Sequence, residues 1–321
     1  MTDVVRVGVL GCAEIARRRM LPALDRCPDT RVTAVASRDP ARAAATAEPY
    51  GARVLPGYAA LLAAPDVDAV YVPLPLALHA EWTEAALRAG KHVLAEKPLT
   101  ADADRTAELC ALARARGLAL MENVMFVHHG QHTRVRQLVA DGALGELRSF
   151  RAEFTVPRRP EGDIRLSPEL GGGALWDTGV YPLRAAQHLL GPDLAVVGAV
   201  AAATSGSAVD TAGSALLRRT TDGVAAHVSW GLDHAYRSGY ELTGSAGRLT
   251  LDMAFTPPAG HRPVVHLHDA SGSREYVLEA EDQVANTVAE FAAAVRRGTA
   301  PQADTLAQAR LLADVRRAAT I

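Results

Sequence analysis

A lysine follows a short apolar run in this chain, where Glu96-Lys97-Pro98 comes directly after residues 91–95. The run predicts a buried strand, and Pro98 keeps Lys97 out of helical geometry. Lys97 is therefore expected at the carboxyl end of a strand, which in open α/β sheets borders the crevice where ligands bind. A solvated loop lysine is the alternative interpretation of this residue taken alone.

A glycine-and-alanine pattern, Gly11-x-Ala13-x-x-Ala16, lies where a first predicted strand turns into a first predicted helix. Gly11 permits a tight turn, and Ala13 lets the backbone approach a pyrophosphate whose charge the helix N-terminus favours. We predict dinucleotide contacts from Gly11, Cys12, Ala13 and Ile15. A turn that uses small residues only for packing is the alternative.

The end of the second predicted strand refines the cofactor. It reads Ser37-Arg38-Asp39, about 20 residues past the glycine pattern, where the ribose hydroxyls should lie. Ser37 and Arg38 offer donors suited to a 2′-phosphate, which favours NADP(H) over NAD(H). Asp39 argues the other way, because it could pair with Arg38 or bind a ribose hydroxyl itself.

Further cofactor contacts are predicted at four places. Pro73 and Leu74 belong to a stiff loop after the strand at residues 68–72, and His79 follows this loop. His79 is otherwise the start of the next helix. Glu96 is expected to position the nicotinamide side, with a cap or surface carboxylate as the alternative. Arg165 is expected to reach a cofactor phosphate or a sugar diphosphate, with a surface salt bridge as the alternative.

A second chemical segment follows three glycines, at residues 171–173. The glycines let a loop fold closely over a ligand. Asp177 and Tyr181 are four positions apart, so on a helix they share one face. An amphipathic helix behind a glycine loop is the structural alternative for the same pattern.

The elements that position these residues differ between the two parts of the chain. Residues 1–121 alternate strands and helices, which predicts a doubly wound parallel sheet in an α/β Rossmann domain. The predicted strands are 4–10, 31–36, 68–72, 92–95 and 118–121, and the predicted helices are 15–24, 41–46, 79–89 and 102–116.

Residues 122–321 predict an α+β domain with a mainly antiparallel open sheet, for substrate binding and oligomerisation. The predicted helices are 128–140, 173–190, 283–297 and 304–318, and the predicted strands are 195–203, 212–218, 224–230, 239–243, 248–251, 264–267 and 275–278.

Composition excludes several classes of protein. The 321 residues carry a formal net charge of −2 with no dense basic cluster, so a nucleic-acid partner is not expected. No apolar stretch is long enough to cross a bilayer, and no signal-peptide pattern precedes the first strand. Cys12, Cys27 and Cys110 lack metal spacing, so we expect neither a metal site nor disulfides, and a cytoplasmic location.

With the dinucleotide pattern and Glu96-Lys97-Pro98 in this order, essentially the whole chain resembles the Gfo/Idh/MocA family of nicotinamide-dependent oxidoreductases. Members of that family carry a Glu-Lys-Pro at this point and an Asp-x-Gly-x-His further on. Here the second motif runs from Asp177 through Gly179 to Tyr181, with tyrosine where histidine is commoner.

The tyrosine at position 181, in place of the commoner histidine, points to one branch of the family. Residues 120–129, 171–184 and 234–238 are similar to the nucleotide-sugar 3-ketoreductases of deoxysugar biosynthesis. The resemblance implies that NADPH reduces the C-3 ketone of a dTDP-linked 3,4-diketo-2,6-dideoxyhexose. Two alternatives stay open: a family member acting on a free sugar, an inositol or a cyclic diol, and a nucleotide-binding regulator without turnover.

Ketone reduction needs a hydride at carbon and a proton at oxygen. Tyr181 is the predicted general acid, and a nearby Lys97 ammonium would lower its pKa from about 10 or stabilise the alkoxide directly. Which of the two donates the proton stays open. Asp177 is expected to orient substrate hydroxyls or Lys97. The other predicted substrate contacts are Asn123, Tyr236 and Arg237, and the open sheet is expected to form a homo-oligomer.

Overall fold

The computed structural model describes residues 4–300 and 302–320, which form two compact units. The first unit runs to Asn123 and takes back Val284–Leu306; the second comprises Val124–Gln283 and the chain from Ala307 onward. The expected boundary at residue 121 lies two residues from the observed one. The expected second domain, however, included helix α8 (Gln283–Arg297), which belongs to the first unit from Val284 onward, and Arg296 near its end pairs with Asp29 of that unit.

Within the described ranges, the first unit holds a six-stranded parallel sheet in the order β3-β2-β1-β4-β5-β6. The order reverses between β1 and β4, and open α/β sheets bind ligands at the carboxyl ends of the strands beside such a reversal. The strands are β1 (Val5–Leu10), β2 (Thr30–Ala36), β3 (Arg53–Leu55), β4 (Ala69–Val72), β5 (His92–Glu96) and β6 (Leu120–Asn123).

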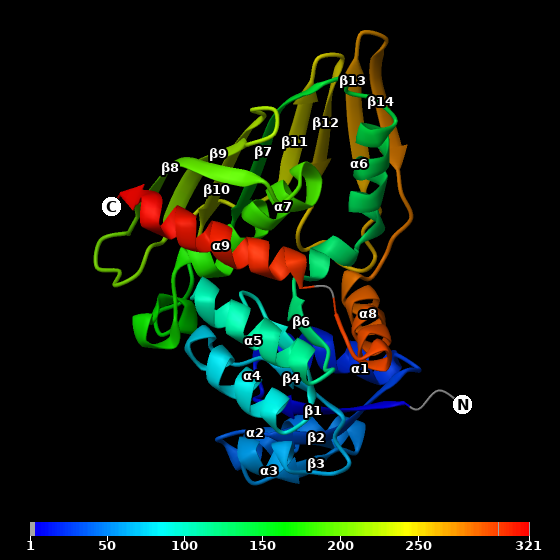
Figure 1. The fold of residues 1–321 in the computed structure, drawn as a ribbon, viewed down its shortest axis with the longest axis vertical. Coiled ribbons are helices and arrows are strands. Elements are labelled where there is room, and N and C mark those ends of the chain that lie inside the picture. The colour runs from blue at the N-terminus through cyan, green and yellow to red at the C-terminus, as the bar shows by residue number, and fades with distance from the viewer. Residues whose placement is uncertain (1–3, 301, 321) are drawn as a thin grey trace. The chain divides into compact units, whose positions relative to one another are not determined.

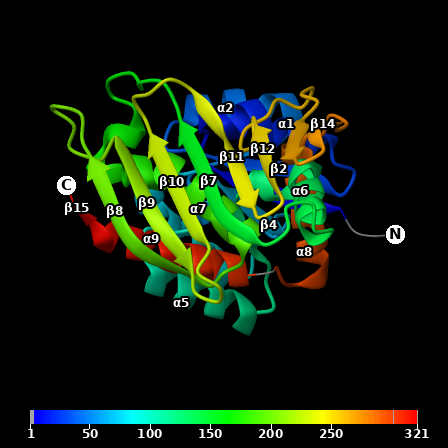
Figure 2. The same cartoon turned by 90° about the horizontal axis from the view of Figure 1, so that it is seen from above.

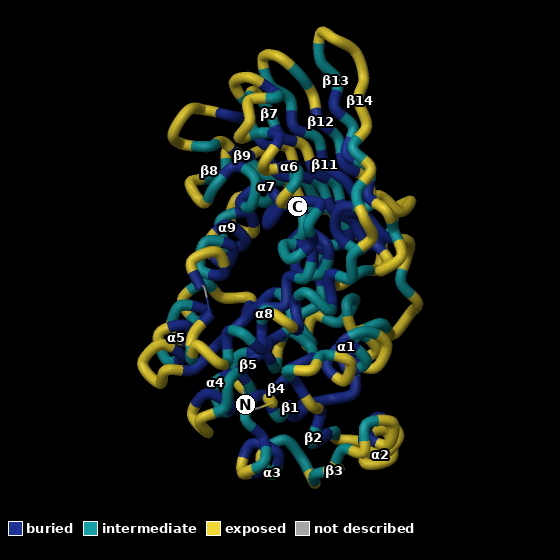
Figure 3. Tube along the Cα trace, turned by 90° about the vertical axis from the view of Figure 1, so that its right-hand side faces the viewer, coloured by how far each residue is buried: buried dark blue, intermediate teal, exposed yellow. Residues whose placement is uncertain are grey.

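The central strands of this sheet are buried because helices cover both faces, which their near-continuous apolar sequences require. Every residue of β4 is buried, and Figure 3 shows exposure concentrated away from β1, β4 and β5. Besides α8, the helical segments are η1 (Ala16–Met20), α1 (Leu21–Arg26), α2 (Pro40–Ala47), η2 (Glu48–Tyr50), α3 (Tyr58–Leu62), η3 (Leu76–Leu78), α4 (His79–Arg88) and α5 (Ala103–Ala115).

The second unit is built on a nine-stranded mixed sheet, counted over the described part of the chain, in the order β14-β13-β12-β11-β7-β10-β9-β8-β15. Most neighbours are antiparallel, as predicted, while β10 pairs with β7 in parallel. The strands are β7 (Leu147–Thr155), β8 (Leu194–Ala202), β9 (Ala212–Arg219), β10 (Ala225–Gly231), β11 (Arg237–Gly244), β12 (Gly247–Asp252), β13 (Val264–Asp269), β14 (Gly272–Val277) and β15 (Ala319–Thr320).

Strand β7 is central to this sheet, yet the sequence patterns did not predict it. Its outward-facing Ser149, Arg151 and Glu153 alternate with buried Phe150, Ala152 and Phe154, so it carries no continuous apolar run. Its place is decided by pairing along its length with both β10 and β11.

Helices cover one face of the nine-stranded sheet. Helix α7 packs on β7 and β10, and Gln308 of α9 donates from Nε2 to the Val180 carbonyl at 2.9 Å. Figure 1 and Figure 2 show α7 and α9 on the same side of the strands, with the other face turned to the viewer in Figure 2. The helical segments are η4 (Met125–His128), α6 (Gly130–Ala140), η5 (Ile164–Leu166), η6 (Pro168–Leu170), η7 (Leu175–Gly179), α7 (Val180–Leu190) and α9 (Ala303–Ala318).

Both helices expected beside ligands begin with a π-helical turn, which the sequence patterns did not predict. Pro22 follows the π turn η1, and Pro182 follows the π turn η7. A proline has no N–H for the carbonyl four residues earlier, so the α-helical ladder is interrupted there and a wider turn fits. In the ranges described, no helix is long and apolar enough to cross a membrane.

Candidate active site

The turn after β1 is shaped for a close backbone approach. Gly11 has φ +104°, and a Cβ at this position would lie 2.9 Å from Cδ2 of Leu74 and 3.8 Å from the Tyr58 hydroxyl. Only glycine adopts this conformation without strain. The structure therefore brings together Gly11 and Leu74, two residues predicted from separate motifs, at one turn beside β1.

At the end of β2, Arg38 is exposed to solvent, whereas Asp39 is hydrogen-bonded to the start of α2. The Asp39 carboxylate caps α2 by accepting from the Arg42 N–H at 3.0 Å, and Ser37 Oγ accepts from the Asp39 N–H at 3.2 Å. Arg38 is exposed, and its charge counteracts the burial that raises the pKa of Tyr58. The sequence left open whether Asp39 would pair with Arg38 or bind a ribose hydroxyl, and in the structure one of its carboxylate oxygens caps α2.

His79 joins two loops at the carboxyl edge of the parallel sheet. Only 2% of its surface is exposed. Its Nδ1 lies 2.9 Å from the Pro98 carbonyl oxygen, and its Nε2 lies 2.7 Å from the Leu74 carbonyl oxygen. Burial lowers the pKa of His79, so the ring is neutral near pH 7.

The peptide around Lys97 is held by its neighbours on both sides. On one side, Oε1 of Glu96 accepts from the Tyr71 hydroxyl at 2.6 Å and from Nδ2 of Asn123 at 2.7 Å. On the other side, the Leu99 N–H donates to the Glu122 carboxylate at 2.9 Å. Lys97 thus stands at the end of β5, as predicted, on a segment whose backbone has little freedom.

Asn123 was predicted to contact substrate, and the structure gives it a different immediate partner. It is 2% exposed, and its amide nitrogen bonds Glu96. Its Oδ1 has no hydrogen-bond partner among the described residues. Tyr71, the other group that fixes Glu96, was missed because a tyrosine inside an apolar strand looks like an ordinary core residue.

In the second unit, Tyr181 stands among phenylalanine rings. The ring centroids of Phe154, Phe255 and Phe126 lie 4.7, 5.9 and 6.1 Å from that of Tyr181. These rings come from β7, η4 and the segment after β12, so several elements fix the phenol. An apolar surround strengthens any charge interaction that the hydroxyl makes.

Asp177 pairs with Arg165, a contact that the sequence did not predict. Arg165 Nε donates to Asp177 Oδ2 at 2.8 Å, and Arg165 Nη1 lies 3.2 Å from Asp163 Oδ1. Burial lowers the pKa of Arg165, but the charges of Asp177 and Asp163 outweigh it and raise the pKa. Arg165 is therefore held between two carboxylates.

The three glycines bring the Arg165 loop against the start of η7. The Gly173 N–H donates to the Arg165 carbonyl at 2.9 Å, and the Gly172 N–H donates to the Ser167 carbonyl at 2.8 Å. Asp210 caps η7 by accepting from the Leu175 N–H at 2.8 Å, and burial raises the pKa of Asp210. No sequence signal indicated Asp163 or Asp210, because both lie in irregular segments.

Tyr236 and Arg237, both predicted substrate contacts, lie on opposite faces of the sheet. The Tyr236 ring is 6.5 Å from that of Phe154, on the face that also carries Tyr181. Arg237 pairs with Thr155 in the β11–β7 ladder, on the other face, and its Nη1 bonds Asp252 at 2.5 Å. Side chains alternate along a strand, so Arg237 faces away from Tyr181, and its contact with substrate stays a prediction.

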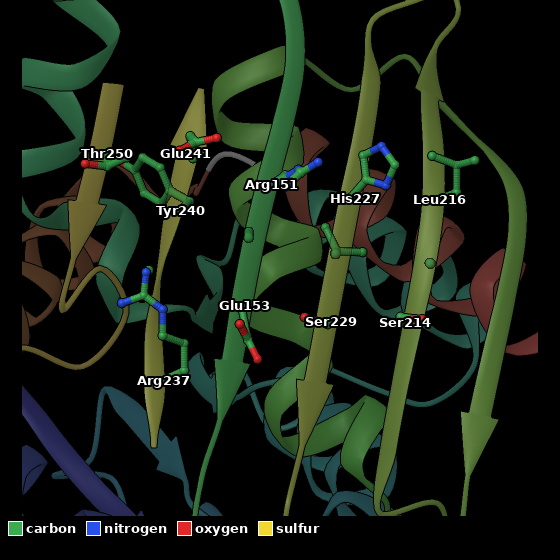
Figure 4. Close-up of a pocket in the computed structure, with 14 residues that line it drawn as sticks. Arg151, Glu153, Ser214, Leu216, His227, Ser229, Arg237, Tyr240, Glu241 and Thr250 are labelled. Carbon is green, nitrogen blue, oxygen red and sulfur yellow. The ribbon is translucent and has the colours of Figure 1, made fainter. Parts of the chain in front are cut away.

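Arg237 lines a hollow of about 540 Å³ on the open face of the sheet. Figure 4 shows Arg151 and Glu153 of β7 with His227 of β10 in this hollow. Across the described residues, no group of three or more His, Cys, Asp or Glu side chains is arranged to hold a metal ion.

Comparisons with known proteins agree with this architecture. Residues 5–124 match the model of an oxidoreductase family with an NAD-binding Rossmann fold, and residues 132–250 match the GFO/IDH/MocA C-terminal domain. The chain is 56% identical over 293 residues (91% of this chain, 86% of the relative) to dTDP-3,4-didehydro-2,6-dideoxy-alpha-D-glucose 3-reductase of Streptomyces violaceoruber. It is 52% identical over 315 residues (97% and 95%) to the enzyme of that name from Actinomadura kijaniata.

Solved structures extend the likeness to the whole fold. KijD10, a 3-ketoreductase from Actinomadura kijaniata solved with NADP and TDP-benzene, superposes with a TM-score of 0.96 at 52% identity, over 99% of this chain and 98% of that one. KijD10 variants with a lysine changed to alanine and a tyrosine changed to phenylalanine have TM-scores of 0.92 and 0.96 at 50% and 51% identity, with the same coverage. The chain belongs to the Gfo/Idh/MocA family of oxidoreductases.

Proposed function

We propose that this protein is an NADPH-dependent 3-ketoreductase that acts on a dTDP-linked 3,4-diketo-2,6-dideoxyhexose. The observation that carries the proposal is the pair of motifs that the fold presents: Lys97 at the end of β5, and Tyr181 one turn beyond Asp177 on the helix of the second unit. Identity of 52–56% to four proteins named for this reaction supports the same substrate class.

The first unit fits NADP(H). A Cβ at Gly11 would clash with Leu74, so the turn requires glycine. Glycine is expected where the backbone must approach a pyrophosphate. Ser37 and the exposed Arg38 would hold the 2′-phosphate, since Asp39 is engaged as a helix cap. Leu74 would brace the nucleotide next to the Gly11 turn. When bound, NADPH supplies the hydride for C-3.

The proton comes from this chain's own residues. Tyr181 donates from its hydroxyl to the C-3 oxygen, and its phenylalanine neighbours keep bulk water away from the phenol. The Lys97 ammonium stabilises the negative charge that develops on oxygen, and it favours the phenolate that Tyr181 leaves behind. Hydrogen bonds of Glu96 and Leu99 hold the backbone on both sides of Lys97, which limits the positions that its ammonium can take.

Arg165 and Asp177 orient the sugar in this proposal. Nε and Nη1 of Arg165 are used by Asp177 and Asp163, and Nη2 has no partner among the described residues. With two carboxylates beside it, the guanidinium suits a hydroxyl or carbonyl oxygen of the sugar. Asp177 then acts by holding Arg165 in place, one helical turn from Tyr181.

Turnover and binding together test the function. Tyr181→Phe and Lys97→Ala should each lower kcat by about 10²- to 10⁴-fold, measured by the absorbance of NADPH. Tyr276→Phe is the matched control, because that ring lies on β14 under Arg134 and takes no part in the site. Turnover of both site variants within threefold of wild type would refute these roles.

The alternatives predict different substrates. Oxidation of free sugars, inositols or cyclic diols with NADP⁺, without binding of dTDP, would indicate a different dehydrogenase of the family. Binding of NADPH without turnover of any keto-sugar would indicate a regulator. Tight binding of dTDP with turnover of the dTDP-keto-sugar supports the proposal.

The open face of the nine-stranded sheet suits a second copy of this chain. Arg151 and Glu153 lie in its hollow, and within the described ranges neither has an ion-pair partner. A two-fold axis would place each beside its opposite on the second copy. In sedimentation velocity, the single variants Arg151→Glu and Glu153→Arg should each be monomeric. The double variant, in which both charges are exchanged, should form the oligomer again. A monomeric wild type, or a double swap that stays dissociated, would refute this interface.

A cytoplasmic location completes the proposal. Cys12, Cys27 and Cys110 are few and odd in number, which is typical of proteins in a reducing compartment. Fractionation of the producing cells tests it.

A further inference from the structure

The His79 ring bridges two segments that the proposed function uses separately. Its Nε2 is 2.7 Å from the carbonyl oxygen of Leu74, whose side chain packs against the Gly11 turn. Its Nδ1 is 2.9 Å from the carbonyl oxygen of Pro98, the residue after Lys97. One buried side chain therefore contacts both the loop beside the dinucleotide turn and the peptide that carries the lysine.

Ordinary core packing does not account for this arrangement. A neutral imidazole has one N–H, so it can donate to only one of two carbonyl oxygens at a time. An apolar side chain in its place would remove the single N–H that the two carbonyl oxygens share in alternate tautomers, at a cost in free energy. The ring serves one loop in one tautomer and the other loop in the second.

We propose that His79 is a positioning residue that links the Leu74 loop to Lys97, so that cofactor binding and placement of the lysine depend on one side chain. The proposal rests on the assignment of Lys97 and of the Leu74 loop in the proposed function. It adds that Nε2 of the ring supports cofactor binding and Nδ1 supports the placement of Lys97. Mutation can therefore separate the two effects.

Two substitutions separate the nitrogens. The amide nitrogen of asparagine falls near the place of Nδ1, so His79→Asn keeps a donor for Pro98 and loses the one for Leu74. The amide nitrogen of glutamine falls near Nε2, so His79→Gln keeps the donor for Leu74 and loses the one for Pro98. The expected result is a split between KM and kcat rather than a uniform loss.

His79→Asn should raise the KM for NADPH about tenfold and leave kcat within about threefold of wild type, because one buried carbonyl has lost its donor. His79→Gln should lower kcat about tenfold and leave the KM for NADPH within about threefold. The matched controls are His92→Asn and His92→Gln in the same unit, where Nδ1 accepts from the Ala119 N–H at 2.9 Å at the amino end of β5. They should change neither constant by more than twofold.

A readout without turnover separates this proposal from the proposed function. The chain has two lysines, Lys91 and Lys97, so lysine labelled with ¹³C at Cε gives two NMR correlations. His79→Gln should move the Lys97 correlation and His79→Asn should leave it in place. The Lys91 correlation is an internal reference, because its ammonium donates to the Ala64 and Val67 carbonyls.

Three outcomes would overturn the proposal. The first is an equal change of KM and kcat in both His79 variants. The second is His79 variants that behave like the His92 variants at equal unfolding temperatures. The third outcome uses wild type alone, in case the variants fail to fold. The ¹⁵N chemical shifts of the His79 ring would stay unchanged when saturating NADP⁺ is added. Loss of all keto-sugar turnover in wild type would refute the proposed function, while the Lys97 correlations would still test His79.

Discussion

Substitution of Gly172 by alanine should damage the site through backbone contacts alone. A Cβ at this position would clash with the Arg165 carbonyl oxygen and lie 2.7 Å from its carbonyl carbon and 2.8 Å from the Ser167 carbonyl oxygen. The backbone of Gly172 does not have a positive φ, so alanine brings no conformational strain of its own. All three atoms belong to the main chain, which cannot rotate away as a flexible side chain would.

The expected size follows from these contacts. Overpacking of this kind costs about 1–3 kcal/mol, and each kcal/mol lowers the Tm by roughly 2–4 °C in a unit of this size. The Arg165 loop must move, which displaces the guanidinium that Asp177 holds. Since misplacement by about 1 Å can cost up to 10²-fold in rate, kcat/KM for the keto-sugar should fall tenfold or more. The KM for NADPH should not change.

Gly260→Ala is the matched control, because its Cβ would meet no atom within 4 Å and its φ is not positive. Thermal unfolding and steady-state kinetics of the two variants would be compared side by side. If Gly172→Ala matches Gly260→Ala in Tm and in kcat/KM, the close approach of the glycine loop to Arg165 is not needed for this site.

Three further predictions concern the cofactor, the sugar and the buried His132. Arg38→Ala should raise the KM for NADPH by about 10- to 100-fold and leave the KM for NADH unchanged, because a charge-assisted bond to the 2′-phosphate is lost; equal changes for both cofactors would contradict it. Asp177→Asn should lower kcat/KM for the keto-sugar by about 10- to 100-fold at constant KM for NADPH, since Arg165 loses a charged partner; a rise in the KM for NADPH would instead place Arg165 at the cofactor. Burial holds the pKa of His132 well below 6.5, so its contribution to stability is complete above about pH 6.5 and is lost as the pH falls below it. Urea unfolding at pH 7 and pH 5.5 should therefore show a smaller loss for His132→Gln than for wild type, by up to about 1.4 kcal/mol per pH unit, and equal losses would show that His132 takes no part.

Local patterns were sufficient to predict where the candidate dinucleotide-binding residues lie in the fold. The strand-turn-helix around Gly11, the loop at Leu74 and the exit of β5 at Lys97 are each encoded within a few consecutive residues. Parallel strands place their carboxyl ends at one edge, so these separate signals converge without further information. Arg38 and Asp39 were the exception, since only the capping bond of Asp39 shows which of the two is available.

The second unit was predictable in class but not in its contacts. The helix carrying Asp177 and Tyr181 followed from spacing, whereas the partner of Asp177 is Arg165 in a loop closed by Gly172. Which face of the sheet Arg237 takes depends on the register of β11 against β7, and β7 itself has no apolar run.

The sequence by itself determined the family, most of the elements and the two side chains to which we assign the chemistry, because catalytic motifs are short and local. The tertiary structure alone decided three things: the return of α8 to the first unit, the Arg165–Asp177 pair and the double contact of His79. Each of these joins residues that no local pattern relates, and each depends on where burial and strand pairing bring the chain back on itself.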